Sequence, residues 1–206
     1  LAAYPHPDEA YLAGLLHDIG ELILLSSIGE PYRRFMVNAE GNTRLQTEER
    51  QLFGTTHAEL GGWLIDHWQL DSVLADGVSF HHAPGSQIQT ATDLPQIVWI
   101  AQALSAGAED TPEFGLALNG SSLKLDKPAL LKAREQAIER TRQIAEALGI
   151  AVSDTFPRRR TQAAASAPVI VDESEHHLVT ERFIAACAGG DLQALTEVLA
   201  PDVWGV

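Results

Sequence analysis

The chain has 206 residues, enough for one sizeable hydrophobic core and a shorter additional segment. Its formal net charge of −14 disfavours direct binding to nucleic acid, which depends on basic contacts to phosphate. The longest apolar run, over 21–28, is too short to span a bilayer, so we expect no membrane contact. The single cysteine excludes an intramolecular disulfide framework, which favours a cytoplasmic location.

Helix signals dominate the first part of the chain. Asp8 can cap a helix that runs to about Leu25, because apolar residues recur there at helical spacing. The stretch 33–50 is polar and broken, with a Gly-Asn turn signal inside it. Thr56 and Glu59 have the spacing of a capping box, which predicts that another helix begins at this point.

Three further helices are predicted downstream. Asp71 can cap a short helix over 72–82, and residues 94–106 have the composition of a buried helix. Residues 128–148 form a long amphipathic pattern. Strands with a period of two are missing from the sequence, so the predicted fold class is all-α.

The chain divides into three predicted segments. Residues 1–150 form the helical domain. Residues 151–170, rich in Ala, Ser, Pro and Arg, have the composition of a linker. Residues 171–206 contain two short helical patterns joined by Gly189-Gly190, too little sequence to bury a core of its own.

Histidines at helical spacing are the most informative residues. His17, followed by Asp18, lies on the inward stripe of the first helix, and His57 and His81 begin or continue the stripes of two others. A single inward histidine is most often a core residue that bonds a carbonyl or carboxylate. Three such residues, with Asp18 and with His82 beside His81, could hold a metal ion.

Three motifs resemble the HDOD domain, an all-helical relative of the HD metal-dependent phosphohydrolases. They are residues 11–22 (YLAGLLHDIGEL), 53–64 (FGTTHAELGGWL) and 78–84 (VSFHHAP), in the family's order. The resemblance extends over about 1–148 and implies an HD/HDOD-like helical bundle. It also implies that the domain is incomplete at its N-terminus here.

The resemblance implies a metal site with two departures. One is the absence of the helix-borne ligand expected upstream of His17, since His6 lies between two prolines. His17 and Asp18 match the His-Asp pair of HD hydrolases, while His57, His81 and His82 fall where HD-GYP phosphodiesterases have additional ligands. Gln102 occupies the expected position of a further ligating Asp, and a neutral amide is a weaker ligand for a divalent ion. We therefore expect a vestigial or weak metal site, with no catalytic residue and no cofactor other than a weakly bound divalent metal.

A second resemblance concerns the C-terminal segment. Residues 181–204 resemble the opening of a SnoaL-like domain, a module appended to some extracytoplasmic-function sigma factors. The segment 171–206 would be the incomplete start of such a domain, and its apolar stripes favour self-association through the tail.

These observations predict a non-catalytic bacterial signalling module. It would bind a small signal or a signalling or transcription-related protein partner. Two alternatives stay open at this point: a metal-dependent HD-type phosphohydrolase or phosphodiesterase acting on nucleotides, and a purely structural helical scaffold.

Overall fold

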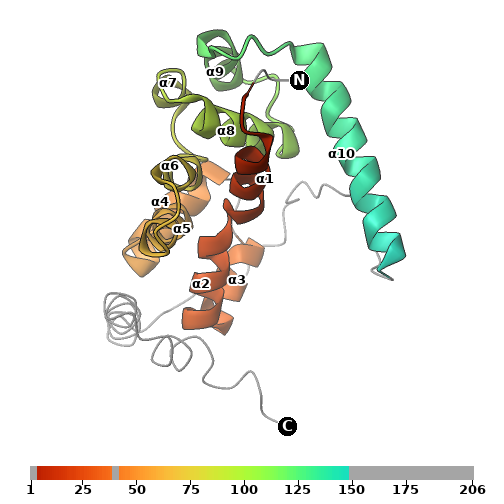
Figure 1. Ribbon diagram of the computed structural model, residues 1–206. Helices are drawn as coiled ribbons and strands as arrows, with labels where there is room; N and C mark the ends of the chain where they lie inside the picture. The colour runs from red at the N-terminus through yellow and green to blue at the C-terminus, as the bar shows by residue number, and fades with distance from the viewer. Residues whose placement is uncertain (1–3, 39–41, 149–206) are drawn as a thin grey trace.

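A computed structural model describes residues 4–38 and 42–148 of the chain. Within these ranges it contains ten α-helices and no strand, which confirms the predicted all-α, HDOD-like fold class. The predicted linker over 151–170 and the predicted SnoaL-like start over 171–206 lie outside the described residues. The helices, labelled in Figure 1, are α1 (Pro7–Leu16), α2 (Ile19–Ile28), α3 (Glu30–Asn38), α4 (Asn42–Phe53), α5 (His57–His67), α6 (Ser72–Ser79), α7 (Gly85–Ile88), α8 (Asp93–Ser105), α9 (Pro112–Gly120) and α10 (Lys127–Ala147).

The first predicted helix is two helices. α1 ends at Leu16, His17 caps it, and Asp18 takes a non-helical conformation (φ −101°, ψ 15°) before α2 begins. The apolar spacing is similar on both sides of this break, so periodicity alone could not reveal it. The N-cap is His6 rather than Asp8, because Pro7 occupies the first helical position, where its missing N–H costs nothing.

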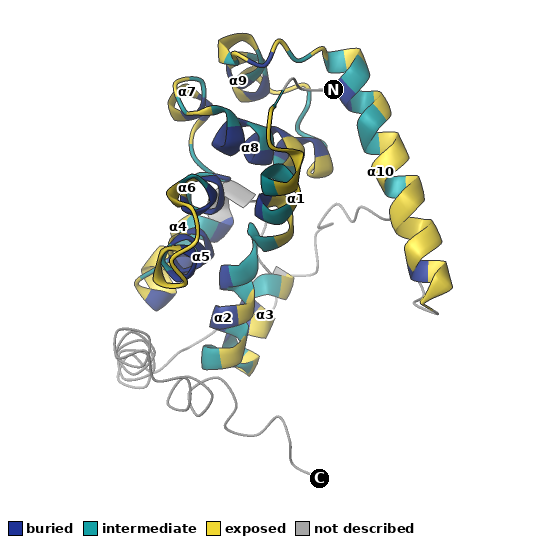
Figure 2. Ribbon diagram, viewed as in Figure 1, coloured by how far each residue is buried: buried dark blue, intermediate teal, exposed yellow. Residues whose placement is uncertain are grey.

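The stretch expected to be polar and broken is largely helical. It contains α3 and α4, which bury aromatic residues that are far apart in sequence. The rings of Tyr32, Phe35 and Phe53 lie 5.4 to 5.7 Å apart and pack with Leu45 into one part of the core. The polar residues that suggested a broken stretch lie mainly on the outer faces of these helices (Figure 2).

The capping signals are confirmed. The Thr56 hydroxyl accepts a hydrogen bond from the Glu59 backbone N–H at 3.2 Å, and the Glu59 carboxylate accepts one from the Thr56 N–H at 3.2 Å. Asp71 accepts a hydrogen bond from the Val73 N–H at 3.0 Å and caps α6, which ends at Ser79, three residues earlier than predicted. The helices α8 and α10 lie where the sequence indicated, whereas α7 and α9 were not predicted.

Glycines let the central helices approach one another closely. A Cβ atom at Gly20 of α2 would lie 1.9 Å from the backbone oxygen of His57. A Cβ at Gly62 of α5 would lie 1.8 Å from the hydroxyl oxygen of Ser79. These contacts bring the start of α5 against the α1–α2 junction and the end of α6, which places three of the predicted site segments together.

The segment Pro7–Ile28 is long and apolar enough to cross a membrane on length and composition, contrary to the sequence expectation. This is weak evidence, because core helices of soluble proteins meet the same criteria. In the structure the segment is divided at His17-Asp18; α1 packs against α6 and α8, and α2 against α3 and α5. Only 22% of its apolar window is buried in the structure, and Tyr11, Leu15 and Leu22 are exposed.

Candidate metal centre

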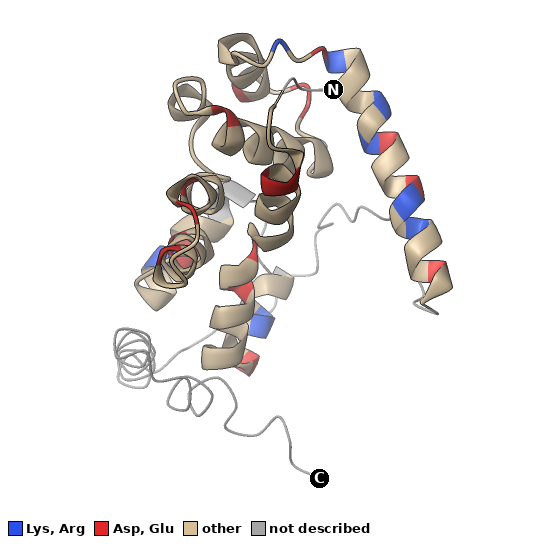
Figure 3. Ribbon diagram, viewed as in Figure 1, with Lys and Arg blue, Asp and Glu red and all other residues tan. Residues whose placement is uncertain are grey.

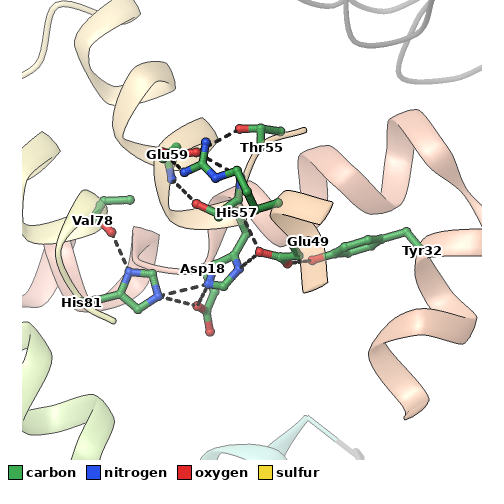
Figure 4. A network of polar contacts seen from close by, with 10 residues as sticks. Asp18, Tyr32, Glu49, Thr55, His57, Glu59, Val78 and His81 are labelled. Carbon is green, nitrogen blue, oxygen red and sulfur yellow. Dashed lines mark hydrogen bonds and ion pairs between the residues drawn. The ribbon is translucent and has the colours of Figure 1, made fainter. Parts of the chain in front are cut away.

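Four side chains from separate segments meet at the centre of the bundle. Asp18 comes from the α1–α2 junction, His57 from the first turn of α5, and His81 and His82 from the turn after α6. One ligand atom from each lies within 4.8 Å of the others. Figure 4 shows three of these side chains, those of Asp18, His57 and His81. The predicted convergence of His17, His57 and His81 is therefore confirmed, since His17 also contacts Asp18.

Asp18 is the common partner of three histidines. One carboxylate oxygen lies 3.1 Å from His17 Nε2. The other lies 3.2 Å from His81 Nε2 and 3.8 Å from His57 Nε2. His57 and His81 are buried, whereas the Asp18 side chain is 41% exposed, so the cluster opens to solvent on the side of Asp18.

The opposite nitrogen of each ring is bonded to a fixed acceptor. His17 Nδ1 lies 2.8 Å from the Gly14 carbonyl, and His81 Nδ1 lies 2.5 Å from the Val78 carbonyl. His57 Nδ1 lies 2.7 Å from a carboxylate oxygen of Glu49. Because carbonyl and carboxylate oxygens accept hydrogen bonds, each Nδ1 carries a proton.

This arrangement directs lone pairs toward one another. In a neutral imidazole with its proton on Nδ1, Nε2 has no hydrogen. The Nε2 atoms of His57 and His81 lie 3.3 Å apart, and both face the carboxylate of Asp18. Two nitrogen lone pairs and a carboxylate that face one another repel unless a proton or a metal ion lies between them. The ligand atoms therefore fit a bound metal ion.

The pKa shifts indicate where protons would lie without a metal. Burial lowers the pKa of His17, but its hydrogen bond to Asp18 and the negative charge of Asp18 raise it overall. Burial lowers the pKa of His81 below its ordinary value, and burial together with the nearby His81 lowers the pKa of His82 to about 2. Protonation to the charged form is therefore easier at His17 than at His81 and His82, and the shifts of the latter two favour the neutral form that metal ligands require.

Gln102 lies beside the cluster, as the resemblance implied. Its side chain on α8 lies near His17 and contributes, as the smallest of the causes, to the raised pKa of that histidine. Because Gln102 is an amide, it adds no carboxylate to the four candidate ligands, among which Asp18 has the single carboxylate.

The described Lys and Arg side chains that form ion pairs bond carboxylates other than that of Asp18. Arg33 and Arg34 bond Glu30, and Arg50 bonds Glu59. Lys127 pairs with Asp110, and Arg134 pairs with Glu109. Many basic residues lie on α10, which projects along one side of the bundle (Figure 3).

Two residues of the site were missed in the sequence. Glu49 on α4 and Tyr32 on α3 are completely buried, and the Tyr32 hydroxyl donates a hydrogen bond to Glu49 at 2.6 Å. A signal was present, because Leu45, Glu49 and Phe53 follow one another at a spacing of four. Had 42–53 been recognised as a helix, this would have placed a carboxylate on an apolar stripe.

A helical bundle in which a His-Asp pair meets histidines from other helices is the arrangement that the resemblance to the HD superfamily led us to expect. Residues 1–84 match the family model of the HDOD domain, and this segment contains all five candidate ligands. The HDOD resemblance is therefore confirmed for this part of the chain.

One relative shares part of the sequence. An uncharacterized protein of Treponema pallidum (strain Nichols) is 29% identical over 75 residues, which are 36% of this chain and 15% of that relative. The chain therefore spans only a small part of that relative's length. No solved structure matches the chain.

Proposed function

We propose that this HDOD segment is a non-catalytic signalling module that holds one divalent transition-metal ion and acts through a protein partner or a small signal. The observation that carries the proposal is the convergence of imidazole nitrogens from His57, His81 and His82 on the single carboxylate of Asp18. By family resemblance, the partner would be a signalling or transcription-related protein rather than nucleic acid.

The donor set favours a borderline metal ion. Imidazole nitrogen suits Zn²⁺, Co²⁺ and Ni²⁺, whereas Mg²⁺ and Ca²⁺ prefer oxygen ligands. Asp18, His57, His81 and His82 offer four ligand atoms, which is the usual full set for a structural Zn²⁺ site. A catalytic ion needs an open position for water, so four protein ligands support a structural or sensory role.

A metal-dependent phosphohydrolase is the second candidate, supported by the His17-Asp18 pair. Two observations weigh against it. The residue beside His17 on α8 is the neutral Gln102. The described cations that form ion pairs bond carboxylates elsewhere, whereas a phosphate site needs Arg or Lys donors.

Metal titration and hydrolysis assays distinguish the two candidates. We expect the purified protein to bind one equivalent of Zn²⁺ or Co²⁺, and His57→Ala to weaken binding by at least about 10-fold. The matched control is His67→Ala, because His67 stacks on Trp63 at the other end of α5. We expect no turnover of a cyclic dinucleotide or a generic phosphodiester with Mn²⁺ or Zn²⁺.

Two outcomes would contradict the proposal. Turnover that His17→Ala abolishes would make the protein a hydrolase. If the folded protein binds no divalent ion at one equivalent, the cluster does not have the proposed metal role, and the structural scaffold is favoured.

A further inference from the structure

Glu49 is a buried carboxylate with a complete set of partners. One oxygen accepts the Tyr32 hydroxyl at 2.6 Å, and the other accepts the backbone N–H of His57 at 3.0 Å and its ring Nδ1 at 2.7 Å (Figure 4). Burying a charge without partners is costly, so this network is what allows a carboxylate among apolar residues. The ring contact matters most, because a bond to the backbone alone would only anchor the start of α5.

We infer that Glu49, oriented by Tyr32, is the positioning residue of the cluster: it fixes the tautomer of His57 and so sets the metal affinity of the site. The inference rests on the proposed metal-binding function and deepens it. Glu49 contacts no other described member of the cluster, so it acts only through His57.

The physical reason lies in the two nitrogens of one ring. A neutral imidazole has one proton, and the hydrogen bond made by one nitrogen decides which of them carries it. With Glu49 accepting from Nδ1, the lone pair of Nε2 faces Asp18 and His81. Without that acceptor the proton can occupy Nε2, where it blocks the atom that would bind the metal.

The carboxylate also strengthens the donor. A negative partner on Nδ1 makes the opposite nitrogen a better ligand, and loss of such a partner typically lowers metal affinity by about 10–100-fold. Tyr32 acts indirectly, because its hydroxyl orients Glu49 while its ring packs in the aromatic core.

The test compares three variants of the full chain with Zn²⁺ and Co²⁺ as probes. We expect Glu49→Gln, which keeps the size but removes the charge, to weaken metal binding by about 10–100-fold. Tyr32→Phe should produce a smaller loss in the same direction. Arg50→Gln is the control, because Arg50 follows Glu49 on α4 but is exposed and bonds Glu59. The metal affinity of this variant should equal that of the wild type.

A spectroscopic measurement shows whether Glu49 sets the tautomer of His57 or only stabilises the fold. In the metal-free wild type, ¹⁵N NMR of the imidazole rings should show His57 protonated at Nδ1 and not at Nε2, with His57→Gln providing the assignment. Thermal unfolding establishes that each variant is folded. If Glu49→Gln does not fold, Tyr32→Phe and the wild-type tautomer still decide the question.

Two results would overturn the inference. One is a folded Glu49→Gln variant with wild-type metal affinity, and the other is a proton on Nε2 of His57 in the wild type. If the wild type binds no metal, the proposed function fails, whereas the tautomer measurement still decides separately whether Glu49 positions His57.

Discussion

The carboxylate of Asp18 shows how burial and hydrogen bonding compete at a single residue. Burial by itself would raise its pKa, but its contacts with His17 first and with His81 second hold the pKa well below its ordinary value. Asp18 therefore stays ionised, and its negative charge is available to offset a bound cation. Replacing it with Asn would remove that charge while keeping the shape.

Tyr4 provides a residue-scale prediction away from the cluster. Burial, followed by the hydrogen bond to Glu9 at 2.8 Å, raises its pKa from 10.0 to about 12. The folded pKa lies above the unfolded one, so this contribution to stability is complete below pH 10.0 and is lost as pH rises to about 12. We expect Glu9→Gln to move the ionisation of Tyr4 back toward the ordinary value, as followed by NMR of its ring carbon.

Asp8→Asn is the control for this prediction. It removes the charge of an acid in the same helical turn, whereas the acid that bonds the Tyr4 hydroxyl is Glu9. An equal change in both variants would mean that general charge near the N-terminus, and not the hydrogen bond to Glu9, sets the ionisation of Tyr4.

At the scale of elements, the approach of α2 to α5 depends on the absence of a side chain at Gly20. A Cβ there would lie 1.9 Å from the His57 backbone oxygen, so the two helices would have to separate. We expect Gly20→Ala to lower the free energy of unfolding by about 3 kcal/mol or more. Chemical denaturation monitored by circular dichroism measures this change.

Gly14→Ala is the matched control on the adjacent helix. A Cβ at Gly14 meets nothing within 4 Å, so alanine should raise the free energy of unfolding by about 0.5–1 kcal/mol through its higher helix propensity. Similar effects of the two substitutions would show that α2 and α5 do not approach as closely as described.

At the scale of the whole molecule, the cluster connects segments that are distant in sequence. Its ligands come from the α1–α2 junction, the start of α5 and the turn after α6, so a bound metal ion would stabilise their mutual packing. At a free Zn²⁺ concentration one hundred times the dissociation constant, we expect about 2.7 kcal/mol of added stability. Thermal unfolding with Zn²⁺, and again after a chelator, measures it.

Mg²⁺ should leave the melting temperature unchanged, because its preference is for oxygen ligands. The stabilisation by Zn²⁺ should persist in His67→Ala and disappear in His57→Ala. Equal stabilisation of both variants would indicate metal binding at another site on the molecule.

Local signals predicted much of the fold. Capping residues such as Thr56 and Asp71 act within a few residues of themselves, so their hydrogen bonds could be anticipated from spacing alone. The helices α3 and α4 were missed because their apolar residues are few, and packing of Tyr32, Phe35 and Phe53 stabilises them. The break at His17-Asp18 was missed because both sides continue one apolar pattern.

The sequence by itself determined the helical class, the HDOD resemblance and the inward placement of His17, His57 and His81, because these follow from composition, motif order and helical spacing. Only the tertiary structure decided which ring nitrogen faces Asp18 and which residue holds His57. The bonds that do this join residues 8, 17 and 24 positions apart. Such contacts depend on how α2, α4, α5 and α6 pack, and helical spacing within one element does not specify the packing of another.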